Sequence, residues 1–150
     1  MRVISLLLLL AGLSFGTTAN SLVVKKQQFT LDSYTTENGQ IIAPVNIGWE
    51  AYGKLNADKS NVILITHYFS GSSHAAGKYH NDDAAPGYWD AIIGPGKAID
   101  TNKFYVISSD TLVNANVFDK HVITTGPATT NAATGKPYGL AFPVVTIGDF

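Results

Sequence analysis

A stretch of small and polar residues follows directly after an apolar run, and its residue types suit the binding of an anion by the main chain. The apolar run covers residues 62–66 (VILIT), and the stretch covers residues 67–77 (HYFSGSSHAAG). Ligands of open α/β sheets bind beyond the carboxyl ends of the strands. A turn of small residues there lets backbone N–H groups face a ligand closely, as in the oxyanion holes of acyl-transfer enzymes. A tight turn without any chemical role is the alternative.

A string typical of a serine nucleophile occurs near the N-terminus, at a place where it cannot serve catalysis. Residues 12–16 (GLSFG) match G-x-S-x-G. That motif works only when a strand precedes the serine and a helix follows it, because the sharp turn exposes the hydroxyl. Here the string lies in a hydrophobic segment that has the features of a targeting signal, so we do not expect it to be catalytic.

Residues 1–19 have the layout of a secretory signal peptide. Arg2 supplies the positive charge, residues 3–13 are apolar, and Thr17 and Ala19 suit a cleavage site after Ala19. The apolar run is too short to span a bilayer, which needs about 20 residues; an uncleaved anchor is the alternative. Because the chain has no cysteine, export points to a bacterial periplasm rather than to a disulfide-rich secreted scaffold. We expect no membrane contact after cleavage.

Histidines and carboxylates near the small-residue stretch raise the question of a metal site. The candidates all carry nitrogen or oxygen donor atoms: His67, His74, His80, Asp82 and Asp83. Their spacing lacks the i, i+4 histidine pair that presents two imidazoles from one helical turn, so we expect no metal. We interpret His67, at the end of the apolar run, as a side chain that supports the loop. His121 is not expected to be a triad base, because histidine follows nucleophile and acid in hydrolase chain order.

The composition indicates a folded chain and excludes several other classes of function. It is 45% hydrophobic and 14% charged, with ten basic and eleven acidic residues and no cysteine. That apolar content is enough for a core. The balanced charge gives no argument for binding nucleic acid or an anionic membrane surface. The absence of cysteine excludes disulfides, thiolate chemistry and cysteine-based zinc sites.

The elements that must position the loop are mainly strands. Residues 22–31 and 41–52 are predicted to form an antiparallel hairpin, with a turn at residues 37–40 that contains Asn-Gly. Residues 62–66 and 104–107 are continuous apolar runs, which are typical of parallel strands covered on both faces.

The rest of the chain is less regular. Residues 88–93 could form a short helix that ends at a Gly-Pro-Gly turn, and residues 108–145 form a long irregular loop, which tends to be functional. Thr146 is a good N-cap, with Asp149 three residues later. A helix would therefore begin at Ile147, and we interpret the chain as a truncated one.

Three segments of the chain, taken in order, resemble the homoserine O-acetyltransferase family. They are WEAYGKLNADKSNVILITHYFSGSSHAAG at residues 49–77, PGYWDAIIGPGKAIDTNKFYVIS at residues 86–108, and TGPATTNAATGKPYGLAFPVVTIGDF at residues 125–150. The resemblance implies that residues 20–150 are the N-terminal portion of an α/β-hydrolase domain. In such a portion an antiparallel hairpin leads into a mostly parallel sheet, and the portion ends before the nucleophile elbow. Full-length relatives are expected to have strand order 1-2-4-3-5, so residues 62–65 are expected to be a bare apolar edge in this chain, where the neighbouring strand is missing.

The resemblance also implies the chemistry and the residues that carry it. A Ser-Asp-His triad, expected beyond residue 150, would pass an acyl group through an acyl-serine. The backbone N–H of Phe69 would be an oxyanion donor, with Tyr68, Ser70 and Gly71 next to the substrate and His67 in support. No bound cofactor is implied, but acyl-CoA can serve as a co-substrate. The partners are then a small acyl donor and an alcohol or water, and a full-length protein can form a homodimer.

Two departures from the family keep alternatives open. The chain carries an export signal, and residues 109–116 (SDTLVNAN) stand where the family has a Gly-rich N-x-L-G segment. Acetyl-CoA is a cytosolic donor, so an exported relative could pass its acyl group to water, as a serine ester hydrolase does. An exported β-rich binding module without catalysis is the alternative from another class. Without a triad, the 150-residue chain alone is expected to be inactive.

Overall fold

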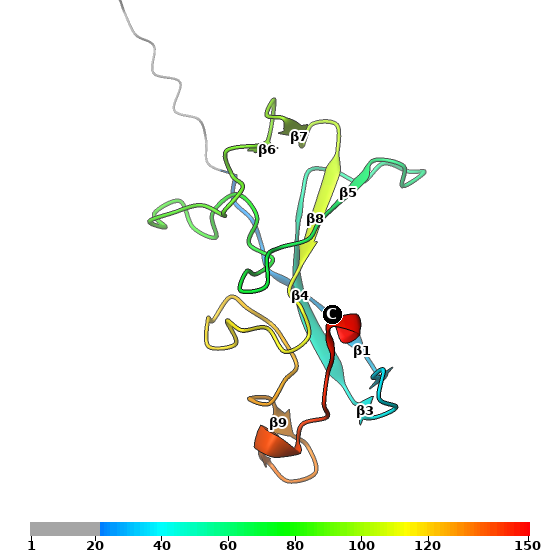
Figure 1. Cartoon of the computed structure of the whole chain (residues 1–150). Helices are drawn as coiled ribbons and strands as arrows, with labels where there is room; N and C mark the ends of the chain where they lie inside the picture. The colour runs from blue at the N-terminus through cyan, green and yellow to red at the C-terminus, as the bar shows by residue number, and fades with distance from the viewer. Residues whose placement is uncertain (1–21) are drawn as a thin grey trace, which may run out of the picture.

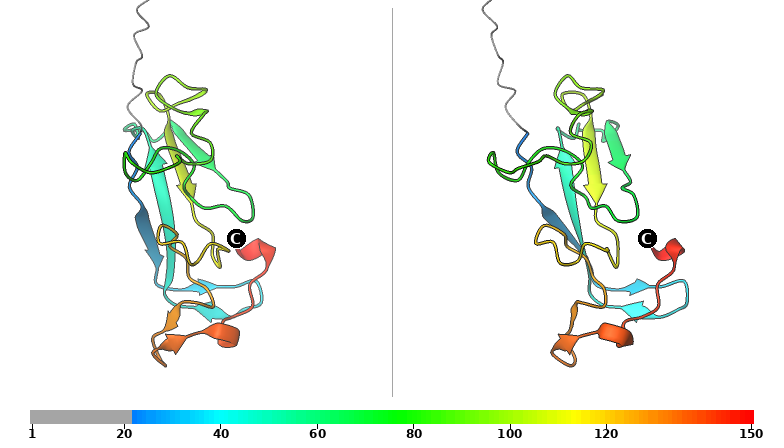
Figure 2. Two further views of the ribbon diagram at one scale, coloured as in Figure 1. Left: turned by 90° about the vertical axis from the view of Figure 1, so that its left-hand side faces the viewer. Right: turned by 60° about the vertical axis from the view of Figure 1, so that its left-hand side comes forward.

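A four-stranded mixed sheet forms the centre of the computed structural model, which describes residues 22–150. Its strands, in spatial order, are β1 (Gln27–Leu31), β4 (Val45–Tyr52), β8 (Tyr105–Ser109) and β5 (Val62–Ile65). The β1–β4 and β4–β8 pairs are antiparallel, whereas β8 and β5 are parallel. Figure 1 and both views of Figure 2 show the strands side by side. Numbered along the chain, the order is 1-2-4-3, which confirms the start of the expected α/β-hydrolase topology.

The remaining elements are short. They are the strands β2 (Tyr34–Thr35), β3 (Ile41–Ile42), β6 (Ile93–Gly94), β7 (Ile99–Asp100), β9 (Thr130–Asn131) and β10 (Lys136–Pro137), and the 3-10 helices η1 (Gly139–Ala141) and η2 (Ile147–Asp149). Residues 22–150 contain no helix that is long and apolar enough to cross a membrane. The expected signal peptide and the G-x-S-x-G string at residues 12–16 lie outside the described residues.

The predicted hairpin is confirmed and is more elaborate than the sequence pattern indicated. Phe29 of β1 faces Ile47 of β4 in an antiparallel register. Between these strands, β2 and β3 form a smaller antiparallel pair. The Gly39 N–H donates to the Thr36 oxygen at 2.8 Å, and Gly39 has a φ of 76°, which glycine adopts without strain. The Asn-Gly turn therefore closes the β2–β3 pair, which is a separate two-stranded sheet, while β1 and β4 pair with each other in the central sheet.

Strand β5 is covered on one face only, and this corrects the expectation for residues 62–66. Side chains on a strand alternate between faces. Ile65 is buried on the covered face, but Val62 and Leu64 are 44% and 64% exposed on the other. The same bare face carries Phe29 of β1, which is also exposed.

The loops that follow β5 and β8 lie together on one side of β4 and β8 (Figure 1). On the opposite side, Val45 and Ile47 of β4 pack in a second hydrophobic cluster with Leu112 and Phe142, so this face is bare at β5 but covered at the start of β4.

The covered face holds the main hydrophobic core. Its buried members are Val24, Tyr52, Ile65, Ala75, Ala76, Ile93 and Val106. They come from the segment before β1, from the sheet, from the loop after β5 and from β6. The sheet therefore fixes the loop after β5 through Ala75 and Ala76, which have no exposed surface.

Two local predictions for residues 88–93 and 146–149 turn out differently. The short helix at residues 88–93 is wrong: the segment is a series of turns, and Ile93 pairs with Ile99 in the small β6–β7 sheet. The Asp90 carboxylate accepts the Gly77 N–H at 2.8 Å, which ties the segment to the loop after β5 instead of to its own helix. The predicted cap at Thr146 is confirmed, because its N–H donates to Asp149 Oδ2 at 2.7 Å, although the helix it begins is 3-10 rather than α.

Candidate functional site

The turn at residues 67–71 lies at the carboxyl end of β5, where the parallel strand β8 also ends. The arrows of β5 and β8 point the same way, and the chain leaving β8 passes close to the chain leaving β5 (right view of Figure 2). The carboxyl ends of parallel strands are where open α/β sheets bind their ligands. All five residues that the sequence singled out are therefore at one edge of the sheet.

Two hydrogen bonds to one carbonyl define the turn. The Gly71 N–H donates to the Tyr68 oxygen at 2.7 Å, and His67 Nδ1 donates to the same oxygen at 2.7 Å. The Tyr68 carbonyl and the Phe69 N–H belong to one planar peptide group, in which they point in opposite directions. Since the carbonyl faces the inside of the turn, the Phe69 N–H faces outward.

The outward amides are unpaired. Within residues 22–150, neither the Phe69 N–H nor the Ser70 N–H donates a hydrogen bond. The Phe69 side chain is 82% exposed. Phe69 borders a pocket of about 220 Å³, whose lining residues are His67, Phe69, Thr111, Val113, Ala115, Ile147 and Phe150. The turn thus presents free N–H donors beside a pocket, as an oxyanion hole requires.

The other expected site residues have distinct surroundings. Tyr68 is exposed and packs edge-on against Tyr88, with ring centroids 5.6 Å apart. Ser70 is exposed, whereas Gly71 is buried and uses both its N–H and its oxygen inside the protein. Gly71 therefore closes the turn and leaves no backbone group for a ligand. His67 Nε2 is buried and has no hydrogen-bond partner among the described residues.

A buried polar cluster that sequence reasoning missed lies behind the turn, around the fully buried Glu50. Lys26 Nζ is 2.9 Å from Glu50 Oε1, and the Tyr79 hydroxyl donates to the same oxygen at 2.6 Å. The Tyr52 hydroxyl and His74 Nδ1 donate to Glu50 Oε2 at 2.8 and 3.1 Å. Burial alone raises the pKa of Glu50, but the His74 bond, the Lys26 charge and the Tyr79 bond outweigh it and hold this pKa below its ordinary value.

The cluster fixes the loop that continues from the turn. The Tyr52 hydroxyl accepts the N–H groups of Ala75 and Ala76 at 3.0 and 3.1 Å. Asp110 accepts the Ser73 N–H at 2.7 Å and the Ile123 N–H at 3.0 Å, so it joins the loops after β5 and β8. Burial, followed by the negative charge of Glu50, raises the pKa of Tyr52, which keeps its hydroxyl protonated as a donor. A charged residue at an inward position of a strand was the only sequence signal of this cluster.

The histidines have separate partners. The Tyr79 ring stacks on His74 and on His121, with centroid distances of 4.3 and 3.8 Å. Burial lowers the pKa of His121. His80 Nδ1 is 3.8 Å from Asp83. In the part of the chain that the structure describes, no group of three or more His, Cys, Asp or Glu side chains could hold a metal ion.

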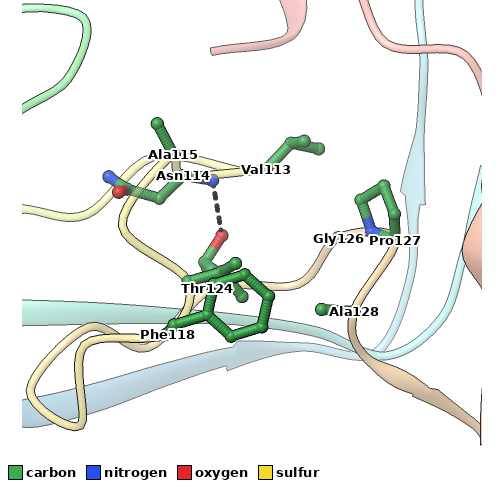
Figure 3. Close-up of a pocket in the computed structure, with 9 residues that line it drawn as sticks. Val113, Asn114, Ala115, Phe118, Thr124, Gly126, Pro127 and Ala128 are labelled. Carbon is green, nitrogen blue, oxygen red and sulfur yellow. Dashed lines mark hydrogen bonds between the residues drawn. The ribbon is translucent and has the colours of Figure 1, made fainter.

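A second, apolar pocket adjoins the first. Its volume is about 310 Å³, and it is lined by Val113, Asn114, Ala115, Val117, Phe118, Thr124, Gly126, Pro127 and Ala128. Figure 3 shows the Asn114 N–H donating to Thr124 Oγ1, at 3.0 Å, across the wall of this pocket. Val113 and Ala115 line both pockets. The loop after β8 therefore separates the free Phe69 amide from a mainly apolar hollow.

Comparison with known proteins gives relatives of two activities. No family model matches the chain. Curated homoserine O-acetyltransferases from Geobacter sulfurreducens and Deferribacter desulfuricans are 45% and 48% identical over 128 residues, which is 85% of this chain. These residues amount to 33% and 32% of the two relatives, so the chain spans about a third of their length.

Solved structures agree with the curated relatives in fold and in extent. The crystal structure of esterase E22 is 69% identical, with a TM-score of 0.82, over 85% of this chain and 35% of that chain. A homoserine O-acetyltransferase from Bacillus anthracis is 56% identical, with a TM-score of 0.81, over 85% and 34%. The chain therefore corresponds to the N-terminal part of a homoserine O-acetyltransferase-like α/β-hydrolase, and the resemblance carried by its sequence motifs is confirmed.

Proposed function

We propose that this chain supplies the oxyanion turn of an enzyme that carries an acyl group on a serine and passes it to water. The observation that supports the proposal most is the unpaired N–H of Phe69, aimed outward at the carboxyl end of β5. Such a donor stabilises the negative charge that develops on a carbonyl oxygen in the transition state. In this proposal His67 supports the turn, while Tyr68 and Ser70 border the substrate.

The reaction proceeds in two steps, with the triad supplied from beyond residue 150. The serine oxygen bonds to the ester carbonyl carbon, its proton passes to the histidine, and the oxyanion that forms accepts the Phe69 N–H. Collapse of this intermediate breaks the ester bond, and the alcohol leaves with that proton. Water then attacks the acyl-serine in the same way and releases the acid. The pocket that Phe69 borders, which Val113, Ala115 and Ile147 also line, suits the acyl chain.

Water is the favoured acceptor, and homoserine is the second candidate. The esterase E22 is 69% identical to this chain, compared with 56% for the homoserine O-acetyltransferase from Bacillus anthracis and 45–48% for the curated homoserine O-acetyltransferases cited above. The signal peptide proposed at residues 1–19 would place the protein in the periplasm, away from cytosolic acyl-CoA. Acyl-CoA remains the co-substrate of the second candidate, which the curated relatives support. Both candidates need only small-molecule partners and no bound cofactor.

A fusion of the full chain to the two thirds of esterase E22 beyond the matched region tests the proposal. We expect the fusion to hydrolyse p-nitrophenyl acetate with a burst of one acyl group per serine, and to do so faster than it acetylates homoserine from acetyl-CoA. The 150-residue chain alone is the control and should show no turnover. Faster homoserine acetylation would favour the second candidate. A folded fusion without either activity would reject acyl transfer and favour the binding module.

A further inference from the structure

Two asparagines of the loop after β8 hold the carbonyl groups of the turn at residues 67–71. Asn116 Nδ2 donates to the Ser70 oxygen at 2.7 Å and lies 3.3 Å from the Gly71 oxygen. Asn114 Nδ2 donates to the Gly71 oxygen at 3.0 Å. Both contacts join residues more than 40 positions apart in the sequence. Among the described residues, these are the hydrogen bonds by which side chains of the loop after β8 contact this turn.

The first asparagine is itself rigidly held. Asn114 is 3% exposed, and its N–H donates to Thr124 Oγ1 at 3.0 Å. Its Oδ1 accepts the Asn116 N–H at 2.8 Å. The preceding residue, Val113, has a φ of 54°, which is rare for a β-branched residue, and its N–H donates to the Thr125 oxygen at 3.0 Å. The loop thus accepts an unfavourable backbone conformation where it directs the two amides at the turn.

Peptide geometry connects these contacts to the free amides. The carbonyls of Tyr68, Ser70 and Gly71 each accept a hydrogen bond from inside the protein. The N–H groups of Phe69 and Ser70 lie between these carbonyls in the chain, and neither has a partner among the described residues. The Ser70 oxygen, held by Asn116, shares one planar peptide group with the Gly71 N–H, so this contact aims the Gly71 N–H at the Tyr68 oxygen. The Tyr68 oxygen in turn shares its peptide group with the Phe69 N–H, which therefore points away from the inside of the turn. A turn without these anchors could rotate its peptide groups and pair its own amides.

We propose that Asn116, buttressed by Asn114, is a positioning residue that keeps the Phe69 N–H aimed at the oxyanion. This inference rests on the proposed acyl transfer and adds to it a role for residues 109–116, the segment where the sequence departs from the family. Asn116 does not touch the reacting atoms. It acts through the Ser70 carbonyl, and its amide N–H, rather than its size, is what the turn needs.

The test compares three variants of the fusion with esterase E22. Asn116→Ala removes the amide, Asn116→Asp keeps the shape but replaces the N–H donor with an acceptor, and Asn38→Ala makes the same change at an exposed turn far from the site. Misplacement of a catalytic donor lowers the chemical step, so we expect kcat per burst-titrated site to fall about 10- to 100-fold in both Asn116 variants. KM should change less than about twofold, since the ground-state ester gains little from the donor. Asn38→Ala should keep the parent values.

The outcomes separate this inference from the proposed function. An active parent whose kcat is unchanged in both Asn116 variants overturns the inference and leaves acyl transfer standing. If Asn116→Ala lowers both kcat and the melting temperature while Asn116→Asp keeps the parent values of both, the role is purely structural and the inference is overturned too. If the parent is inactive, acyl transfer fails, and NMR spectra of the full chain decide the geometry. The Phe69 and Ser70 amide resonances must then shift in Asn116→Ala but not in Asn38→Ala, and unshifted resonances contradict the inference.

Discussion

At the scale of residues, Glu50 organises more of the site than any residue singled out by the sequence. Its side chain and that of Asp110 have no exposed surface, and Lys26, with 11% of its side chain exposed, contacts both. A buried carboxylate is costly unless it is paired and hydrogen-bonded, and Glu50 has four such partners. The cluster holds the loop at residues 73–76, and so it fixes the chain directly after the turn at residues 67–71.

This arrangement makes stability depend on pH in a definite direction. The folded-state pKa of Glu50 lies below its ordinary value of 4.5, so the unfolded chain binds a proton first as the pH falls. The stabilisation is therefore complete above that value and is lost as the pH drops through the lower, folded-state pKa. For the dilute 150-residue chain, we expect the urea concentration at the unfolding midpoint to decrease as the pH is lowered below 4.5.

Glu50→Gln should weaken that dependence and lower stability at pH 7 by about 3 kcal/mol, because it leaves the charge of Lys26 less compensated. Asp32→Asn, at an exposed carboxylate, is the matched control. Equal midpoints and equal pH slopes for Glu50→Gln and the parent would contradict this role of the cluster.

The turn itself could be predicted from sequence, whereas its supports could not. Small residues after an apolar run mark a strand-to-loop junction, and this local pattern placed Phe69 and His67 correctly relative to β5. The contacts of Glu50, Asp110 and Asn116 with the loop join residues 24 to 46 positions apart. No local pattern encodes such contacts, and one sequence gives no partner for a lone carboxylate or amide.

At the scale of elements, β5 is an edge strand with an apolar outer face. It pairs with β8 alone, and Val62 and Leu64 are exposed. A bare edge with apolar side chains is a template for pairing with another chain. The run of apolar residues predicted the strand but not its covering, because periodicity shows which residues can be buried and not whether a neighbour is present. The absence of a helix at residues 88–93 has a related cause, since the tie from Asp90 to Gly77 is tertiary.

We expect the 150-residue chain to self-associate through this strand. Leu64→Lys places a charge on the bare face and should shift the protein toward monomer, without lowering its melting temperature by more than about 2 °C. Leu140→Lys makes the same change at an exposed leucine of η1, away from the sheet, and should leave the association unchanged. Sedimentation velocity measures both. A parent chain that is monodisperse and melts cooperatively would contradict the expectation.

At the scale of the whole molecule, the proposed function makes the site one half of a catalytic arrangement. The chain matches about a third of the length of its relatives, and it provides the outward amide and the loops that hold it. The serine that would carry the acyl group is proposed to come from the remaining part, beside β5. Under this proposal the Phe69 donor acts only in a molecule that contains both parts, and its contribution must be measured there.

The most direct measurement compares Phe69→Pro with Phe69→Ala in the fusion with esterase E22. Proline removes the backbone N–H, whereas alanine keeps it and removes the ring. Loss of one oxyanion donor costs about 100- to 1000-fold in kcat. We predict a loss of that size for Phe69→Pro with both variants folded by circular dichroism, and a change of less than about fivefold for Phe69→Ala. Equal kcat values for the two variants would contradict the assignment of Phe69 as an oxyanion donor.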